Sequence, residues 1–217
     1  MSGATSIRRP HRPAPTLERL ATRYSLPQTA LVLGAVVAGV VLLGILYEAG
    51  VPLGRRFDIN REASLSSAAS GGLLLLAATA AFAYWQQHRD LWFGLLAAFL
   101  LFMACDEVFA IHERAQATSG VEWQRLYLPV VAAGALAGLL TLRALWNRRH
   151  GHVAFLLGGA GWAGAMVLER FRGDINGASE SVRSVAIVTE ESLEMAGTVL
   201  IVIALLAAIK AVPSRPR

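Results

Sequence analysis

Charged residues are scarce in this chain. Only 16% of its 217 residues are Asp, Glu, Lys or Arg, whereas 55% are hydrophobic, and the mean hydropathy is +0.50. A soluble domain of this length needs far more polar surface, so the composition predicts a polytopic membrane protein. The chain has a single cysteine, Cys105, which excludes an internal disulfide framework.

Several signatures of soluble proteins are also missing. The sequence contains no Gly-rich phosphate loop and no H-E-x-x-H metal motif. Its pI near 10.1 is high, and its basic residues are almost all arginine, with Lys210 the only lysine. These basic residues lie beside apolar segments, which is the pattern of membrane topology. We therefore expect no nucleic-acid partner.

Six apolar segments are present, and a bilayer crossing needs about 20 apolar residues. We expect an all-α bundle of about six transmembrane helices over residues 28–210, surrounded by lipid. The first segment has no convincing signal-peptide cleavage site after it, so we interpret it as an anchor. The predicted spans are Thr29–Tyr47, Ala63–Trp85, Leu91–Cys105, Leu126–Trp146, Val153–Leu168 and Val185–Ile209.

The two ends of the chain lack such segments. Residues 1–27 form a basic arm whose first part, rich in Pro and Arg, is expected to be disordered. Thr16–Tyr24 has apolar residues at helical spacing, which fits either a short interfacial helix drawn to anionic lipid or a plain juxtamembrane linker. Residues 211–217 are interpreted as a tail.

Charge also predicts an orientation. With both termini in the cytoplasm, twelve basic residues fall on the inner side and eight on the outer side, as the positive-inside rule prefers. The arginine-rich composition fits a bacterial source, so we expect a multi-pass protein of the bacterial cytoplasmic membrane. Thirteen of the fifteen acidic residues then fall on the outer side. The positive-inside rule does not require that, so another reason must gather the carboxylates.

The third span indicates where some of these acids lie. Leu91–Cys105 covers only about 22 Å as a helix, short of a hydrocarbon core of about 30 Å. We therefore expect the helix to continue through Asp106 and Glu107 to about Ile111. On one continuous helix, residues seven apart share a face, which would pair Glu107 with Arg114.

Glu194 is the deepest of the outer acids, because it lies within the sixth span itself. An ionised carboxylate near the bilayer centre costs about 2.5–3.5 kcal/mol, so it should face protein or water and needs a partner. Glu190 and Glu191 adjoin it at helical spacing. Either Glu194 is neutral, or it shares a cation or His112 with Asp106 and Glu107.

Three segments, "FDINREAS" (57–64), "CDEVFAIHE" (105–113) and "EESLEMAG" (190–197), resemble motifs of a family of uncharacterised prokaryotic membrane proteins with about six spans. In that family the segments F-D-x-x-R-E, D-E-x-x-x-x-H-E and E-E-x-L-E-M recur in this order. The resemblance implies no activity. It points to the following residues: Asp58, Arg61, Glu62, Asp106, Glu107, His112, Glu113, Glu190, Glu191 and Glu194.

One hypothesis for these residues is a metal site near the outer face. Carboxylates with one imidazole suit a divalent metal ion such as Mn²⁺, Fe²⁺, Zn²⁺, Mg²⁺ or Ca²⁺. The candidate ligands are Asp106, Glu107, His112, Glu113, Glu190, Glu191 and Glu194. The candidate supporting charge pairs are Asp58, Arg61, Glu62, Glu169 and Arg170.

Two alternatives stay open. Intramembrane Glu and His residues also suit a proton- or cation-coupled transporter. Outer arginines could instead pair with the acids in a purely structural lattice, because such ion pairs produce similar clusters. The sequence does not decide whether the protein is an enzyme, and it does not predict an oligomeric state. Small residues four apart, Gly159/Ala163 and Ala160/Gly164, favour close helix packing in the fifth span.

Overall fold

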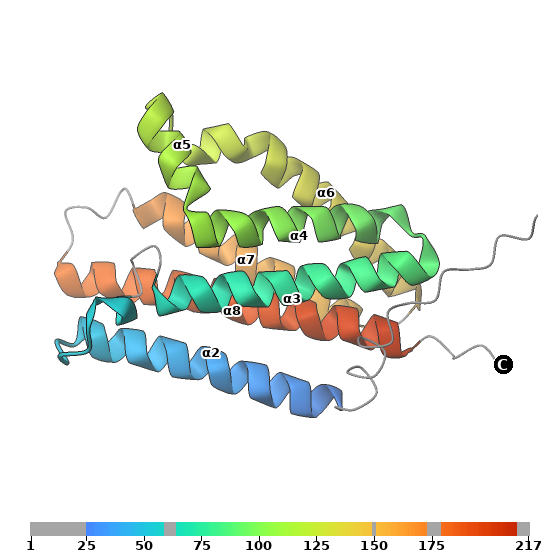
Figure 1. Cartoon of the computed structure of the whole chain (residues 1–217), viewed down its shortest axis with the longest axis horizontal. Helices are drawn as coiled ribbons and strands as arrows, with labels where there is room; N and C mark the ends of the chain where they lie inside the picture. Colours follow the sequence, from blue (N-terminus) through green and yellow to red (C-terminus); the bar gives the residue numbers. More distant parts are fainter. Residues whose placement is uncertain (1–24, 59–63, 149–150, 173–178, 212–217) are drawn as a thin grey trace, which may run out of the picture.

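The computed structural model describes residues 25–58, 64–148, 151–172 and 179–211. All regular structure within these ranges is helical (Figure 1). The elements are α2 (Leu26–Glu48), the short 3-10 helix η1 (Arg55–Phe57), α3 (Leu65–His88), α4 (Leu91–Phe109), α5 (Ile111–Ser119), α6 (Trp123–Arg148), α7 (His152–Arg172) and α8 (Glu180–Lys210).

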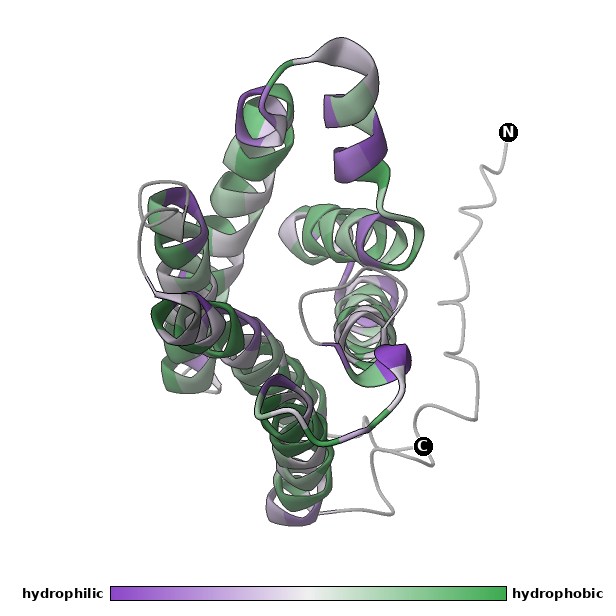
Figure 2. Ribbon diagram, turned by 90° about the vertical axis from the view of Figure 1, so that its left-hand side faces the viewer, coloured by the Kyte–Doolittle hydropathy of each residue, from purple (hydrophilic) through white to green (hydrophobic). Residues whose placement is uncertain are grey.

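Six of these helices, α2, α3, α4, α6, α7 and α8, are long and apolar enough to cross a membrane, which confirms the predicted all-α fold with six spans. Large apolar side chains are exposed on them, among them Leu31 (74%), Leu128 (66%) and Leu139 (64%). Figure 2 views the bundle from the α5 end and shows hydrophobic residues dominating the long helices. An exposed apolar surface of this extent fits lipid contact.

The helix ends gather at two poles (Figure 1). One pole carries α5 together with the ends of α4 and α7 and the starts of α3, α6 and α8; we call it the α5 end. The start of α2 and the end of α8 lie at the opposite pole. The chain therefore enters and leaves the six-helix bundle on the same side.

Local sequence explains several helix boundaries. Ser25 caps α2 through a capping box with Gln28, and Ser64 accepts from the backbone N–H of Ser67 at the start of α3. Arg89 adopts a left-handed conformation, which ends α3 and allows the tight turn into α4. These short connections make α3 and α4 antiparallel neighbours.

The third span differs from the prediction in one respect. Asp106 and Glu107 are indeed helical, but α4 ends at Phe109 and does not continue to Ile111. Ala110 has a φ of 49°, in the left-handed region, so the chain breaks there and restarts as α5. The seven-residue pairing of Glu107 with Arg114 on one continuous helix is therefore wrong.

The closest helix contact joins α7 and α8. An added Cβ at Gly158 would meet the carbonyl oxygen of Gly197 at 2.6 Å, and one at Gly197 would meet that of Gly158 at 2.7 Å. The sequence predicted close packing at Gly159 and Gly164. Gly159 has open space where its Cβ would stand, whereas a Cβ at Gly164 would meet the side chain of Leu193 in α8 at 3.5 Å. The prediction was therefore right about the helix and right about one of its two glycines.

The buried apolar core lies mainly between α3, α4 and α8. Tyr84 stacks on Phe93 with ring centroids 4.0 Å apart, and both residues are fully buried. The predicted N-terminal arm, residues 1–24 of it, and residues 212–217 of the tail lie outside the described residues, so both stay predictions.

Candidate functional site

Asp106 is the hub of the polar residues at the α5 end. It is 4% exposed, and its carboxylate accepts three hydrogen bonds. The backbone N–H of His112 donates to Oδ1 over 2.9 Å, the ring nitrogen Nδ1 of His112 contacts Oδ2 at 2.9 Å, and the hydroxyl of Tyr127 donates to Oδ1 over 2.8 Å. A carboxylate can only accept, so Nδ1 carries the proton in this pair.

The break at Ala110 makes this arrangement possible. The left-handed residue turns the chain so that the first turn of α5 faces back onto the last turn of α4. Ala110 offers no capping side chain, and the carboxylate of Asp106 satisfies an N–H of α5 in its place. A negative charge at a helix N-terminus is also favoured by the helix dipole.

Aromatic rings fix the imidazole from the α6 side. The ring centroids of His112 and Trp123 lie 5.2 Å apart, and those of Trp123 and Tyr127 lie 5.8 Å apart in an edge-on arrangement. The His112 side chain keeps 19% exposure. Asp106, Tyr127 and Trp123 together hold it in one orientation.

Trp123 also connects α6 to α7. Its indole Nε1–H donates to Oε1 of Glu169 over 2.9 Å. Both residues line a pocket of about 460 Å³ that lies between α4, α6, α7 and α8, and we call it the inter-helix pocket. That volume lies in the range of ligand pockets in proteins.

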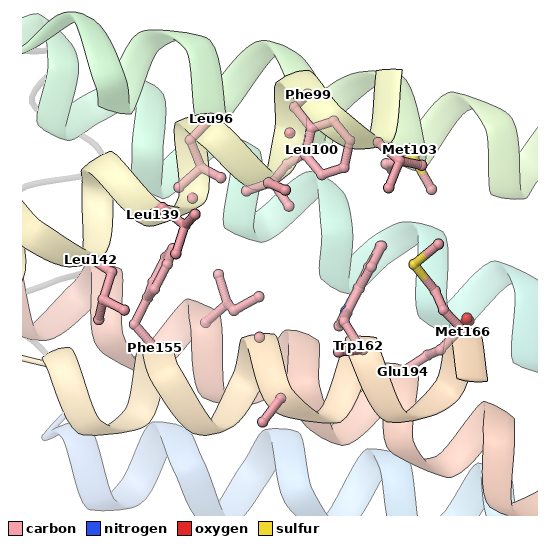
Figure 3. Close-up of a pocket in the computed structure, with 18 of the residues that line it drawn as sticks. Leu96, Phe99, Leu100, Met103, Leu139, Leu142, Phe155, Trp162, Met166 and Glu194 are labelled. Atoms are coloured by element: carbon pink, nitrogen blue, oxygen red, sulfur yellow. The ribbon is translucent and has the colours of Figure 1, made fainter. Parts of the chain in front are cut away.

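The wall of the inter-helix pocket is almost wholly apolar. Its residues include Phe99, Met103, Leu142, Phe155 and Trp162, and the charged residues that line it within the described part of the chain are Glu169 and Glu194. Figure 3 shows Glu194 and Met166 at one end of the pocket and Leu142 and Phe155 at the other. The pocket is therefore a long apolar space with carboxylates toward the α5 end.

Glu194 lines this pocket. Its carboxylate forms no hydrogen bond or ion pair with any residue in the described part of the chain. Four other ionisable groups lie close enough to act on it electrostatically, and three of them are carboxylates: Glu107, Glu169, Glu190 and His112. Carboxylates thus outnumber the one imidazole around Glu194.

The other predicted site residues differ in how far they are exposed. Glu190 is buried at 6% exposure, whereas Glu191 and Asp58 are partly buried, and Glu113 and Arg170 are exposed. Arg61 and Glu62 lie outside the described residues. The structure therefore brings together Asp106 with His112, and Glu194 with Glu107, Glu169 and Glu190.

No group of three or more His, Cys, Asp or Glu side chains within residues 25–58, 64–148, 151–172 and 179–211 has an arrangement that could hold a metal ion. The divalent metal hypothesis gains no support from these residues and stays a prediction. The imidazole of His112 is engaged by a protein carboxylate, and that interaction uses the nitrogen Nδ1.

Sequence reasoning did not identify Tyr127 or the role of Trp123. Tyr127 is a single aromatic residue in an apolar span, and Trp123 resembles an ordinary interfacial tryptophan. Glu169 was expected to belong to a charge pair, and the structure gives it an indole donor. The sequence did contain one signal for these roles, because Trp123 and Tyr127 are aromatic residues with a polar group and lie one helical turn apart.

The chain matches a protein-family model. No curated protein and no solved structure matches the chain. A family model covers residues 25–209, which contain all six long helices except Lys210, the last residue of α8, together with Asp106, His112 and Glu194. By this match the chain belongs to the family described as Domain of unknown function (DUF8692).

Proposed function

We propose that this membrane protein binds a positively charged group at Glu194. The observation that supports the proposal best is the carboxylate of Glu194, which is only partly exposed and lies inside a helical bundle, yet has no hydrogen-bond or ion-pair partner within the described residues. Buried carboxylates are normally paired, because an isolated charge in a medium of low dielectric constant is costly. A bound cation supplies the partner that the protein does not.

The surroundings of Glu194 favour a cation over an anion or a neutral ligand. Glu107, Glu169 and Glu190 all act on it with negative charge, and among the described residues His112 is the one group that acts with positive charge. Like charges repel strongly away from bulk water, so an incoming cation relieves several unfavourable interactions at once. An anion would meet repulsion from the same groups.

The location of the site belongs to the same proposal. We place the α5 end on the outer side of a bacterial cytoplasmic membrane, because the basic residues of the sequence favour cytoplasmic termini. The motif segments 105–113 and 190–197 would then border one face. A reporter fusion after Ser119 tests the orientation, and a cytoplasmic signal from it would overturn this assignment.

Transport is an alternative function for the same residues. A proton- or cation-coupled transporter would use the same carboxylates, with a polar path that continues past Glu194 toward the opposite pole. In this structure the pocket beyond Glu194 is lined by apolar residues such as Leu142 and Phe155. That lining favours a binding site over a transport path.

Thermal unfolding of the purified protein in detergent tests the cation site, because a ligand that binds only the folded state raises the melting temperature. The probes are butylamine and dodecylamine, with dodecanoate as the anionic control and Mn²⁺ or Mg²⁺ as the inorganic cation. The variants are Glu194→Gln and, as a matched control, Glu113→Gln, whose glutamate is exposed in α5.

We expect both amines to raise the melting temperature of the wild type and of Glu113→Gln, and to leave Glu194→Gln unchanged. An equal shift in Glu194→Gln and the wild type would contradict the proposal. So would a shift with dodecanoate as large as that with dodecylamine. If the melting temperature rises only with the metal ions, and only when Glu194 is present, the ligand of the site is a metal ion and not an organic cation.

A further inference from the structure

The shape of the inter-helix pocket carries information that Glu194 alone does not. On α7 the pocket lining runs from Phe155 to Met166, a distance of about 16 Å along the helix at 1.5 Å per residue. All of the lining between these two residues is apolar. A small cation such as an ammonium ion would leave this length of pocket without an occupant.

We propose that the ligand of this site is a single-chain amphiphile with a primary-amine head, whose alkyl chain fills the inter-helix pocket while the ammonium group pairs with Glu194. This inference rests on the proposed cation site. An extended alkyl chain advances about 1.3 Å per carbon, given a C–C bond of about 1.52 Å, so a chain of about twelve carbons spans the 16 Å of apolar lining.

The amphiphile enters from the membrane. Leu139 on α6 and Leu156 on α7 both line the pocket, yet they are 64% and 49% exposed, respectively. A residue that faces both the pocket and the surroundings marks an opening, and here it lies between two helices whose outer surface contacts lipid. An alkyl chain can pass through such an opening sideways without leaving an apolar environment.

The head group then decides which lipid binds. A chain that moves from the bilayer into the pocket exchanges one apolar environment for another, so the hydrophobic effect contributes little. The pairing of an ammonium with Glu194 is strong at this depth, because the dielectric constant is low and both groups are already removed from bulk water. A carboxylate or phosphate head would be repelled by Glu107, Glu169 and Glu190.

Two glycines allow the position of the alkyl chain to be tested separately from the position of the ammonium head. Gly138 and Gly159 both line the pocket, and an added Cβ at either would have nothing within 4 Å. A leucine there fits the backbone and occupies the space assigned to the alkyl chain. Gly34, in α2, also has nothing within 4 Å of an added Cβ, is exposed and does not line this pocket, so Gly34→Leu is the matched control.

The experiment reconstitutes the full chain in lipid nanodiscs and follows quenching of tryptophan fluorescence by dodecylamine with a bromine near the middle of its alkyl chain. Trp162 lines the pocket, so a bound chain lies against it. Each variant is compared at the same mole fraction of amine in the bilayer, which removes partitioning from the comparison. Butylamine binding, measured from the melting temperature, reports the head site alone.

We expect Gly138→Leu to weaken dodecylamine binding by roughly tenfold or more, a change of about 1.4 kcal/mol or more, because the leucine occupies the space assigned to the alkyl chain. Butylamine binding should be unchanged in that variant, and Gly34→Leu should bind both amines as the wild type does. Gly159→Leu repeats the test if Gly138→Leu does not fold.

The outcomes separate the two proposals. If both pocket variants bind dodecylamine as tightly as Gly34→Leu does, while Glu194→Gln still loses it, the chain lies elsewhere and only the cation site stands. If Glu194→Gln binds dodecylamine as the wild type does, both the head position and the cation site are wrong.

Discussion

The indole Nε1–H of Trp123 donates to Oε1 of Glu169 across 2.9 Å, and this bond joins the first turn of α6 to the last turns of α7. The same indole ring lies 5.2 Å from the imidazole of His112. Trp123 therefore connects the polar hub at Asp106 to the carboxylate end of the inter-helix pocket.

Trp123→Phe tests this connection. Phenylalanine keeps an aromatic ring against His112 but has no N–H, so we expect the free energy of unfolding in detergent to fall by about 1 kcal/mol. Glu169→Gln retains an acceptor oxygen, so its free energy of unfolding should fall by less. A Trp123→Phe variant as stable as the wild type would show that the bond contributes nothing to stability.

Asp106 should be among the least replaceable polar residues of the described chain. Asp106→Ala removes the acceptor of three hydrogen bonds that partly buried His112 and buried Tyr127 donate, so we expect the free energy of unfolding to fall by an amount on the order of 3 kcal/mol or more. Chemical unfolding in detergent measures it.

Asp106→Asn and Tyr127→Phe provide graded comparisons for that loss. Asp106→Asn keeps one acceptor oxygen. Tyr127→Phe removes a single hydrogen bond, so it should lower the free energy of unfolding by about 1 kcal/mol. If Asp106→Ala cost no more than Tyr127→Phe, the hub would not hold α4, α5 and α6 together.

Ala110 should accept glycine with a gain in stability. Its φ of 49° lies in the left-handed region, where a side chain costs roughly 1–2 kcal/mol relative to glycine. We expect Ala110→Gly to raise the melting temperature and Ala110→Val to lower it. Ala115→Gly, within α5, is the control and should destabilise by up to about 1 kcal/mol. A destabilised Ala110→Gly variant would contradict the break between α4 and α5.

Gly158 and Gly159 are neighbours in sequence, but we expect substitution by alanine to destabilise the protein at Gly158 and to stabilise it at Gly159. Gly158→Ala places a methyl group 2.6 Å from the carbonyl oxygen of Gly197, so α7 and α8 must separate, at a cost of about 1–3 kcal/mol. Gly159→Ala meets nothing and should gain up to about 1 kcal/mol from helix propensity. Equal melting temperatures for the two variants would contradict the packing of α7 on α8.

The fold was more accessible from sequence than the site was. Long apolar segments such as Thr29–Tyr47 identify spans by composition alone, and their number was predicted correctly. The break at Ala110 was missed, because alanine is the strongest helix former and gives no local signal for a left-handed residue. That single residue decides how His112 faces Asp106.

The carboxylate of Glu194 was recognised from its depth in the sixth span, because a charged group at that depth is costly unless it has a partner. The inter-helix pocket beside it was not predictable. It depends on which faces of four helices diverge, and residues such as Leu142 and Phe155 look like ordinary core or lipid-facing residues in the sequence. Tertiary packing alone distinguishes those cases.

Photo-crosslinking tests most directly whether an amine-headed chain lies in the pocket with its head at Glu194. Dodecylamine with a diazirine at the end of its chain is irradiated in nanodiscs that contain the full chain, and the labelled residues are identified by mass spectrometry. The account predicts labels around Leu142 and Phe155, removed by excess unmodified dodecylamine and absent in Glu194→Gln. Labels confined to lipid-facing residues such as Leu31, or equal labelling in Glu194→Gln and the wild type, would contradict it.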